Sequence, residues 1–250
     1  IVDKGADLRN DISDVTNLDY LDFKGAIKIE VRGSSSSQLP KKQYALTTYD
    51  SLGQKEDVSI LGMPKENDWI LNGIAYDSSL IRYYLSYQLS NQIGQYASRG
   101  QYCEVMLNGN YEGIYLFQEK LKADDNRINI KKIQPEDLSL PNLTGGYITK
   151  TDKIEGSDLE AWSMPNHGGW GSSFVHEYPK SMEIKPLQHE YIKGEFERLA
   201  NTSSNKNSSV KDGYPSVIDV PSFIDFMILN EFSANVDGYQ FSTFFHKDRN

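Results

Sequence analysis

Residues 104–119, with the sequence EVMLNGNYEGIYLFQE, decide the fold class of this chain. Largely apolar runs flank Asn108-Gly109, the dipeptide that tight β-turns with positive φ prefer. The segment therefore predicts an antiparallel hairpin of two strands, 104–107 and 111–119, the second of which ends at Glu119.

Alternating residues predict a second pair of strands upstream of this hairpin. Isoleucine and valine alternate with charged side chains over 27–32, which is the period of a half-buried strand. Five small residues, 33–37, turn the chain, and 41–49 is expected to return as the partner strand. Asp77 is expected to cap a helix that stops at Gly94.

Helical patterns dominate the second half of the chain. Residues 188–200 are predicted to form a helix, and a second helix over 221–234 is apolar on nearly every side, which predicts burial in the core. A last strand is expected over 239–246. Strands early and helices late indicate an α+β fold, with a mostly antiparallel N-terminal sheet followed by a more helical C-terminal part.

For other stretches the structure is predicted from amino-acid composition, because they show no regular spacing of apolar residues. Glycine and proline recur over 155–180, which predicts a long irregular loop. The basic stretch 127–132 predicts a short edge strand. Residues 1–22 are polar and acid-rich, and are expected to lead into a domain that spans 23–250.

The composition excludes several classes of function. The chain has 250 residues, with 26 Lys and Arg against 35 Asp and Glu and a net charge of −9. No excess positive field is therefore available for nucleic acid or for an anionic membrane. No apolar run reaches the ~20 residues that span a bilayer. A single cysteine, Cys103, excludes an intrachain disulfide, and four scattered histidines argue against a zinc site.

The turn between the first two strands is a candidate phosphate site. Arg32, Ser34 and Ser35 lie in a run of small residues that precedes Lys42 on the returning strand. Backbone N–H groups of such a turn can approach phosphates, and a lysine on the next strand can neutralise them. The alternative is a polar hairpin loop with solvated lysines.

Two acidic residues at the ends of predicted elements are further candidates. Glu119 ends its strand, where a carboxylate can orient a lysine or contact a nucleotide; the alternative is a surface acid. Asp237 follows the apolar helix and can accept a proton from a hydroxyl, and Ser242, five positions later, can help to hold a metal. The alternative for this segment is helix capping, with Asn235 or Gly238 in the left-handed conformation.

Three other side chains have structural and functional readings. Trp162 and Trp170 flank a glycine-rich loop, as aromatic residues that stack on sugars do, and the alternative is that they anchor a long loop. Cys103 lies in a predicted strand, where a buried and inert thiol is expected.

Several segments together resemble the spore coat protein H (CotH) family of kinases. The agreement in order and spacing covers roughly residues 23–247, and its most specific part is the run Asn-Gly-x-Tyr-x-Gly-x-Tyr-x-x-x-Glu. The segments that carry the resemblance are Arg32-Gly33-x-Ser35, 40–46, 68–71, 77–82, 107–115 with Glu119-Lys120, 145–147, 223–226 and Asn235-Val236-Asp237-Gly238.

The resemblance implies a divergent protein-kinase-like fold that uses ATP with Mg or Mn to phosphorylate Ser or Thr of a secreted or coat protein. Asp237 would lie near the acceptor hydroxyl, and Ser242 would stand where ordinary kinases carry a metal-binding asparagine. Lys42 would neutralise the phosphates and pair with a carboxylate, for which Glu119 is the first candidate. The implied nucleotide-binding residues are Arg32, Ser34, Ser35, Lys42 and Glu119.

The resemblance also sets expectations about the whole protein. The family's Trp-Asp-x-(Asp/Asn)-x-x-x-Gly segment, which supplies a metal-binding aspartate, has no counterpart before Asn250, so we expect the sequence to stop ahead of it. Family members are typically exported, which implies a secreted or cell-surface bacterial protein, a signal segment upstream of Ile1 and a protein substrate rich in Ser and Thr. The rival reading is a non-catalytic assembly or carbohydrate-associated module of an extracellular coat or polysaccharide-degrading complex.

Overall fold

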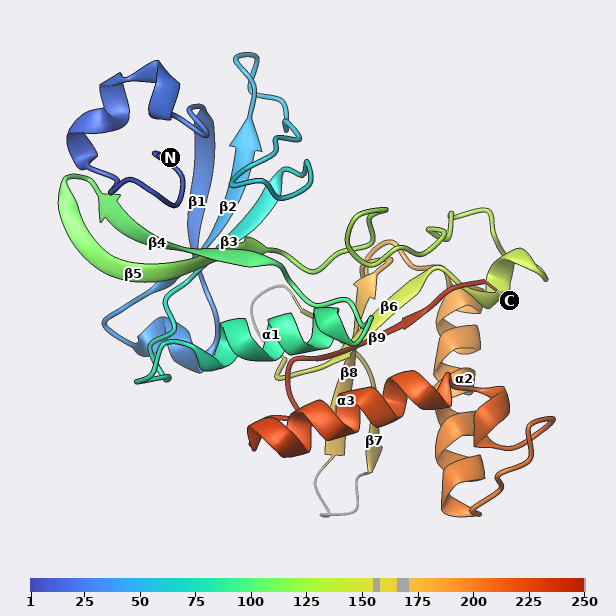
Figure 1. Ribbon diagram of the computed structural model, residues 1–250. Helices are drawn as coiled ribbons and strands as arrows, with labels where there is room; N and C mark the ends of the chain where they lie inside the picture. Colours follow the sequence, from blue (N-terminus) through green and yellow to red (C-terminus); the bar gives the residue numbers. More distant parts are fainter. Residues whose placement is uncertain (155–157, 166–170, 250) are drawn as a thin grey trace. The chain divides into compact units, whose positions relative to one another are not determined.

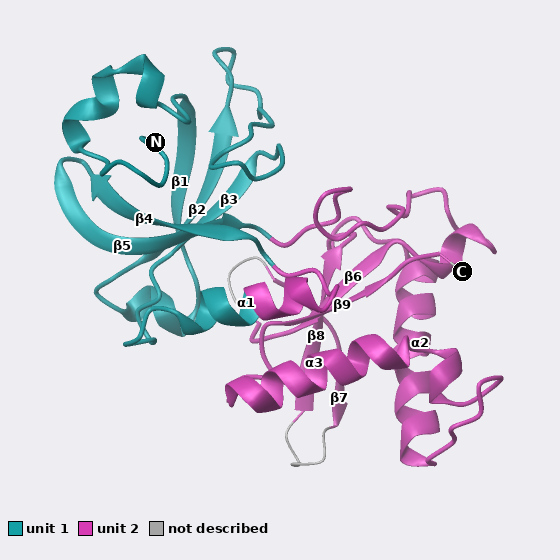
Figure 2. Ribbon diagram, in the orientation of Figure 1, with its two compact units in different colours: residues 1–87, 98–120 teal, residues 88–97, 121–250 magenta. Residues whose placement is uncertain are grey.

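The computed structural model describes residues 1–154, 158–165 and 171–249, and the chain divides into two compact units (Figure 2). Unit 1 comprises residues 1–87 and 98–120, and unit 2 comprises 88–97 and 121–250. Each unit contains one antiparallel sheet, and three α-helices complete the mixed fold in the described part of the chain (Figure 1). The prediction of mixed α and β structure with early antiparallel strands is confirmed.

The sheet of unit 1 has five strands in the order β1-β2-β3-β5-β4. The hairpin at Asn108-Gly109 forms as predicted, because both residues adopt the positive φ that its turn requires, 51° and 82°. One face of the sheet carries the core, in which Trp69 stacks on Phe117 with 5.2 Å between ring centroids. The strands are β1 (Ala26–Arg32), β2 (Gln43–Tyr49), β3 (Asp68–Asn72), β4 (Gly100–Leu107) and β5 (Asn110–Glu119).

The first strand differs from its prediction in burial. β1 forms where the alternation places it, but all seven of its residues are exposed, so the prediction of a half-buried strand is wrong. β1 is an edge strand of the sheet. The alternation of apolar and charged residues does not reveal whether another layer of structure covers either face of a strand. The partner strand β2 begins at Gln43, two residues later than predicted. The lead-in is tied to the unit where the Ile1 ammonium donates to the carbonyl of Phe23 at 2.6 Å.

The first helix ends before Gly94 as predicted, but it begins at Arg82 rather than directly after Asp77, because Leu80, with a φ of 62°, keeps the intervening residues in a turn. Asp77 accepts hydrogen bonds from the backbone N–H groups of Ser79 at 3.0 Å and Arg82 at 2.8 Å. Burial acts to raise the pKa of the Asp77 carboxyl, but these hydrogen bonds outweigh it and hold the pKa below its ordinary value. Helix α1 (Arg82–Gln92) ends just before Gly94, whose φ is 87°.

The sheet of unit 2 has four strands in the order β7-β8-β6-β9. Helix α2 (Pro186–Ser204) contributes Ile192 and Phe196 to a core that Tyr147, Trp162 and Phe174 supply from the sheet. Ile148 of β6 points to the other face, against a cluster that contains Ala123, Ile128 and Ile130. The strands are β6 (Tyr147–Thr151), β7 (Glu160–Pro165), β8 (Gly171–Tyr178) and β9 (Thr243–Lys247).

Two predictions made from composition are wrong. Much of the described part of 155–180 forms the hairpin β7–β8 rather than an irregular loop, because Trp162 and Phe174 stack on each other at 5.0 Å beneath α2. Trp170 lies outside the described residues. The basic stretch 127–132 forms no edge strand; Ile128 makes one isolated bridge to Ala123, and its side chain is buried. In both places tertiary contacts outweigh the local glycine, proline or charge content.

Helix α3 (Val220–Ser233) forms as predicted, but it is not buried. Asn230 is the buried residue of the helix, whereas Ile228 is 55% and Phe232 76% exposed. Phe223 lies against Phe245 of β9, with ring centroids 6.3 Å apart. A helix that is apolar all round is buried only where neighbours cover every side, and the described residues do not supply such cover. No helix in the described ranges is both long and apolar enough to cross a bilayer.

A buried histidine pair in unit 2 predicts sensitivity to acid. His176 Nε2 and His189 Nδ1 lie 2.9 Å apart beside Trp162, and burial, with the charge of His189, lowers the pKa of His176 to about 4. The unfolded chain, with the ordinary pKa of 6.5, binds this proton first, so stability falls as the pH drops from about 6.5 toward 4. We expect a loss of about 3 kcal/mol in the free energy of unfolding across that window.

Urea denaturation at pH 7, 5.5 and 4.5 measures this loss. His176→Gln should flatten the pH dependence between pH 6.5 and 4, even if it lowers the stability at pH 7. An equally steep dependence in that variant would show that other groups cause it.

Candidate functional site

The serine turn of unit 1, residues 33–38, closes on itself through hydrogen bonds. Gly33 has a φ of 95°, and a Cβ there would lie 2.1 Å from a serine hydroxyl, so the turn requires glycine. Ser34 accepts at its carbonyl from the Ser37 backbone N–H at 3.0 Å and from the Ser37 hydroxyl at 2.6 Å. Arg32 is the last residue of β1, and Ser34 and Ser35 lie on the compact turn that follows it.

Two adjacent lysines follow the serine turn and reach different partners. The Lys42 ammonium donates to the Ser37 carbonyl at 2.9 Å. The Lys41 ammonium donates to the Ile114 carbonyl of β5 at 2.5 Å and lies 4.7 Å from the centroid of the Tyr115 ring. Lys42, rather than Lys41, therefore contacts the serine turn.

Glu119 has a different partner from the one predicted. Its carboxylate accepts three hydrogen bonds from Arg99: from the backbone N–H at 3.1 Å, from Nε at 3.0 Å and from Nη2 at 2.7 Å. The Glu119 side chain is 0% exposed, so the reading as a surface acid is wrong. The expected ion pair between Glu119 and Lys42 is also not formed. Arg99 directly precedes β4, which pairs with β5, and its guanidinium binds the Glu119 carboxylate instead.

A polar network next to Glu119 was not predicted. Gln118 accepts at its amide oxygen from Asn72 Nδ2 at 3.3 Å, and both residues are buried. Burial raises the pKa of the Tyr87 phenol, while a hydrogen bond with Gln118 and the positive charge of Arg32 act in the opposite direction.

The segment after α3 holds Asp237 on a braced turn. Ala234 takes the left-handed cap position with a φ of 49°, so the expectation that Asn235 or Gly238 adopts it is wrong. Asn235 Nδ2 donates instead to Asn230 Oδ1 at 2.8 Å. A Cβ on Gly238 would lie 2.6 Å from the same oxygen, which explains the glycine.

The Asp237 side chain plays no part in this bracing. Asp237 is exposed, and its backbone carbonyl accepts a hydrogen bond from Phe241 N at 2.9 Å. Within the described ranges, the Asp237 carboxylate has no hydrogen-bond or ion-pair partner. Ala234 and Asn235 cap the C-terminus of α3. The carboxylate of Asp237 is therefore available to a ligand.

Ser242 meets a carboxylate that the sequence did not single out. Its hydroxyl donates to Asp152 Oδ2 at 3.4 Å, just beyond β6. Ser242 and Tyr239 both have positive φ, 49° and 70°, conformations that cost energy in non-glycine residues and cluster at functional sites. Lys150, also on β6, binds Asp158 at 2.6 Å and lies 4.0 Å from Asp152.

The donors near Ser242 suit a hard cation only in part. Hydroxyl and carboxylate oxygens are the ligands that Mg²⁺ and Mn²⁺ prefer. Across 1–154, 158–165 and 171–249, however, no cluster of three or more His, Cys, Asp or Glu residues can hold a metal ion. The described residues thus offer an oxygen pair, Ser242 and Asp152.

The thiol and tryptophan candidates have structural roles. Burial raises the pKa of the Cys103 thiol to about 11, which keeps it protonated and unreactive. Trp162 is 7% exposed within the core beneath α2, so its ring presents no platform for a sugar.

Comparison with known proteins identifies the family. A family model described as CotH kinase protein matches residues 29–250. No curated protein matches the chain. The matched range contains the serine turn, Lys42, the hairpin that ends at Glu119 and the turn that bears Asp237. The chain therefore belongs to the CotH kinase protein family.

Proposed function

We propose that this protein is an ATP-dependent kinase that transfers the γ-phosphate to Ser or Thr residues of a secreted or coat protein. The observation that carries the proposal is the contact between the Lys42 ammonium and the serine turn, at 2.9 Å from the Ser37 carbonyl. A cation fixed beside small residues can neutralise phosphate oxygens while backbone N–H groups approach them closely. In this role Arg32, Ser34 and Ser35 contribute the rest of the phosphate site.

Asp237 is the proposed catalytic base. Phosphoryl transfer depends mostly on positioning, together with a carboxylate that accepts the proton of the attacking hydroxyl. The braced turn of Asn230, Asn235 and Gly238 positions Asp237, and its carboxylate is exposed without a protein partner in the described ranges. Both features support this assignment.

The proposed metal, Mg²⁺ or Mn²⁺, would be held by the oxygens of Ser242 and Asp152. Mg²⁺ commonly binds through one or two protein oxygens and keeps water and phosphate oxygens as its other ligands. When bound, such an ion neutralises the charge of the transferred phosphate. Lys150 lies 4.0 Å from the Asp152 carboxylate, so a positive charge already stands beside the proposed ligand pair.

The assembly module is the second candidate. The exposed apolar side chains of α3 favour it, because contiguous apolar surface commonly marks a site of protein association. Thermal denaturation separates the two candidates: ATP with Mg²⁺ or Mn²⁺ raises the melting temperature of a nucleotide-binding protein, and it leaves that of a pure assembly module unchanged.

Removing the Lys42 ammonium is expected to weaken nucleotide binding. Lys42→Ala deletes one charge-assisted contact to phosphate, which is worth about 1.5–3 kcal/mol. We therefore expect the affinity for ATP with Mg²⁺ to fall about 10- to 100-fold, as measured by isothermal titration calorimetry.

Lys28→Ala is the matched control for this change. Lys28 lies in the same unit, and its exposed ion pair with Glu30 contributes little to stability. ATP affinity should be the same in Lys28→Ala as in the wild type. An unchanged affinity in Lys42→Ala as well would contradict the assignment of Lys42.

A further inference from the structure

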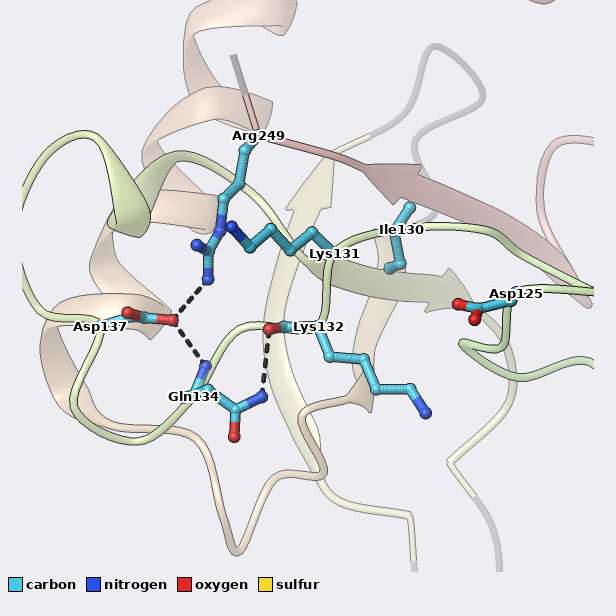
Figure 3. A pocket seen from close by; sticks show the side chains of 7 residues that line it. All are labelled: Asp125, Ile130, Lys131, Lys132, Gln134, Asp137 and Arg249. Atoms are coloured by element: carbon cyan, nitrogen blue, oxygen red, sulfur yellow. Dashed lines mark hydrogen bonds and ion pairs between the residues drawn. The ribbon is translucent and has the colours of Figure 1, made fainter.

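The basic stretch that was expected to be an edge strand forms instead one wall of a pocket in unit 2. The pocket has a volume of about 460 Å³, and Lys131, Lys132 and Arg249 supply its cationic side chains (Figure 3). Asp125 and Asp137 also line it. Three cations against two carboxylates leave this pocket positive, on a chain whose net charge is −9.

The walls of the pocket are joined by hydrogen bonds between distant segments. Lys131 donates its backbone N–H to Asp248 Oδ1 at 2.9 Å, and Gly146 donates its backbone N–H to the Lys247 carbonyl at 2.7 Å. A Cβ on Gly146 would lie 2.4 Å from the Lys131 carbonyl. Glycine at position 146 therefore permits the close approach that brings the basic stretch to the chain segment of Arg249.

Arg249 has one donor without a partner. Its Nη2 pairs with Asp137 Oδ2 at 2.5 Å, and its Nη1 donates to Asn142 Oδ1 at 3.0 Å. Its Nε is buried and has no hydrogen-bond partner. Buried donors in native proteins are nearly always satisfied, so this N–H marks the place of a missing acceptor.

The two lysines of the pocket are also unpaired. Within the described residues, the ammonium groups of Lys131 and Lys132 make no ion pair or hydrogen bond, whereas Asp137 is occupied by Arg249. In Figure 3 the Lys131 side chain extends toward the guanidinium of Arg249, and Asp125 lies at the far end of the pocket, beyond Ile130. An unpaired ammonium and an unpaired Nε–H thus converge on the same part of the pocket.

We propose that this pocket binds a phosphate monoester, such as the phosphorylated serine of a protein. A phosphate dianion offers three acceptor oxygens and about twice the charge of a carboxylate, which suits the Arg249 Nε–H and the neighbouring Lys131 ammonium, whereas the Lys132 side chain extends away from them (Figure 3). The pocket is separate from the segment of Asp237 and Ser242, because it adjoins the opposite end of β9, about 16 Å along the strand. The inference does not depend on the proposed kinase activity, although a kinase for serine would generate this class of ligand.

The test is a titration of the ¹⁵N-labelled protein with a phosphoserine peptide, with inorganic phosphate and with the glutamate analogue of the peptide. Because Nε–H groups of arginine give resolved NMR signals, the Arg249 signal, assigned by its loss in Arg249→Lys, reports the site directly. We expect phosphoserine and inorganic phosphate to shift this signal, and the phosphoserine peptide to bind at least 10-fold more tightly than the glutamate peptide. Equal affinity for the glutamate peptide would overturn the choice of phosphate.

Lys131→Gln should weaken the binding of the phosphoserine peptide about 10-fold, the usual result of removing one charge-assisted hydrogen bond. Lys211→Gln makes the same change in charge at an exposed position of unit 2 outside the pocket, and should leave the affinity unchanged. Lys42→Ala should also leave it unchanged, which separates this site from the proposed nucleotide site. The proposal fails if the Arg249 signal does not respond, or if Lys131→Gln binds as the wild type does.

Discussion

Replacing Asp237 by asparagine is expected to lower phosphate transfer to a serine-bearing protein by about 10²-fold or more, the scale of losses of a general base. Asparagine keeps the shape of the side chain but cannot accept the proton of the acceptor hydroxyl. The turn itself should persist, because Asn230, Asn235 and Gly238 hold it without help from the Asp237 carboxylate. The measurements are the rate of ³²P transfer from ATP and the affinity for ATP.

The stability of this variant distinguishes catalysis from capping. We expect the free energy of unfolding of Asp237→Asn to stay within about 0.5 kcal/mol of the wild type, as for other exposed substitutions. Asp212→Asn, an exposed change of the same kind in unit 2, is the matched control and should retain full transfer. If Asp237→Asn retains full phosphate transfer, another residue is the catalytic base. If the variant unfolds, the carboxylate has a structural role.

Replacing Glu119 by alanine is expected to lower the free energy of unfolding by about 3 kcal/mol. The substitution removes a fully buried carboxylate and leaves three donors of Arg99 without their acceptor. Breaking a buried pair from one side typically costs 3–5 kcal/mol, and the partial exposure of Arg99, 37%, lets water recover some of that cost. Urea denaturation followed by circular dichroism measures the loss.

Glu104→Ala provides the comparison on the neighbouring strand. Glu104 is exposed and accepts a hydrogen bond from the Tyr111 hydroxyl at 2.5 Å, so its removal should cost less than about 1 kcal/mol. If Glu119→Ala lowers the free energy of unfolding no more than Glu104→Ala does, the ion pair between Arg99 and Glu119 does not stabilise the fold. Glu119→Gln, which keeps the volume, then tests whether the carboxylate also affects ATP affinity.

The strongest sequence signals concerned local backbone geometry, and these predictions are confirmed. Asn108-Gly109 specified its turn through the positive φ of both residues, and Gly94 marked the end of α1. Each signal acts within a few residues of the chain, so the sequence contains all the information needed to interpret it.

Predictions about burial were less successful, because burial depends on distant partners. The helix α3 formed where predicted, but its apolar composition did not reveal that Phe232 stays 76% exposed. The hairpin β7–β8 was missed because the stacking of Trp162 on Phe174 beneath α2 outweighs the glycine and proline content of that region.

The family motifs, the strand pairs β1–β2 and β4–β5, and the candidate residues Arg32, Lys42, Glu119, Asp237 and Ser242 could all be identified from the amino-acid sequence. The partners of these side chains became known only from the folded chain: Arg99 rather than Lys42 for Glu119, and Asp152 for Ser242. Folding also brought the basic stretch to Arg249, across 117 residues between Lys131 and Asp248. Backbone propensities act over a few residues, whereas hydrogen bonds and ion pairs depend on distances that the packing of the whole unit sets.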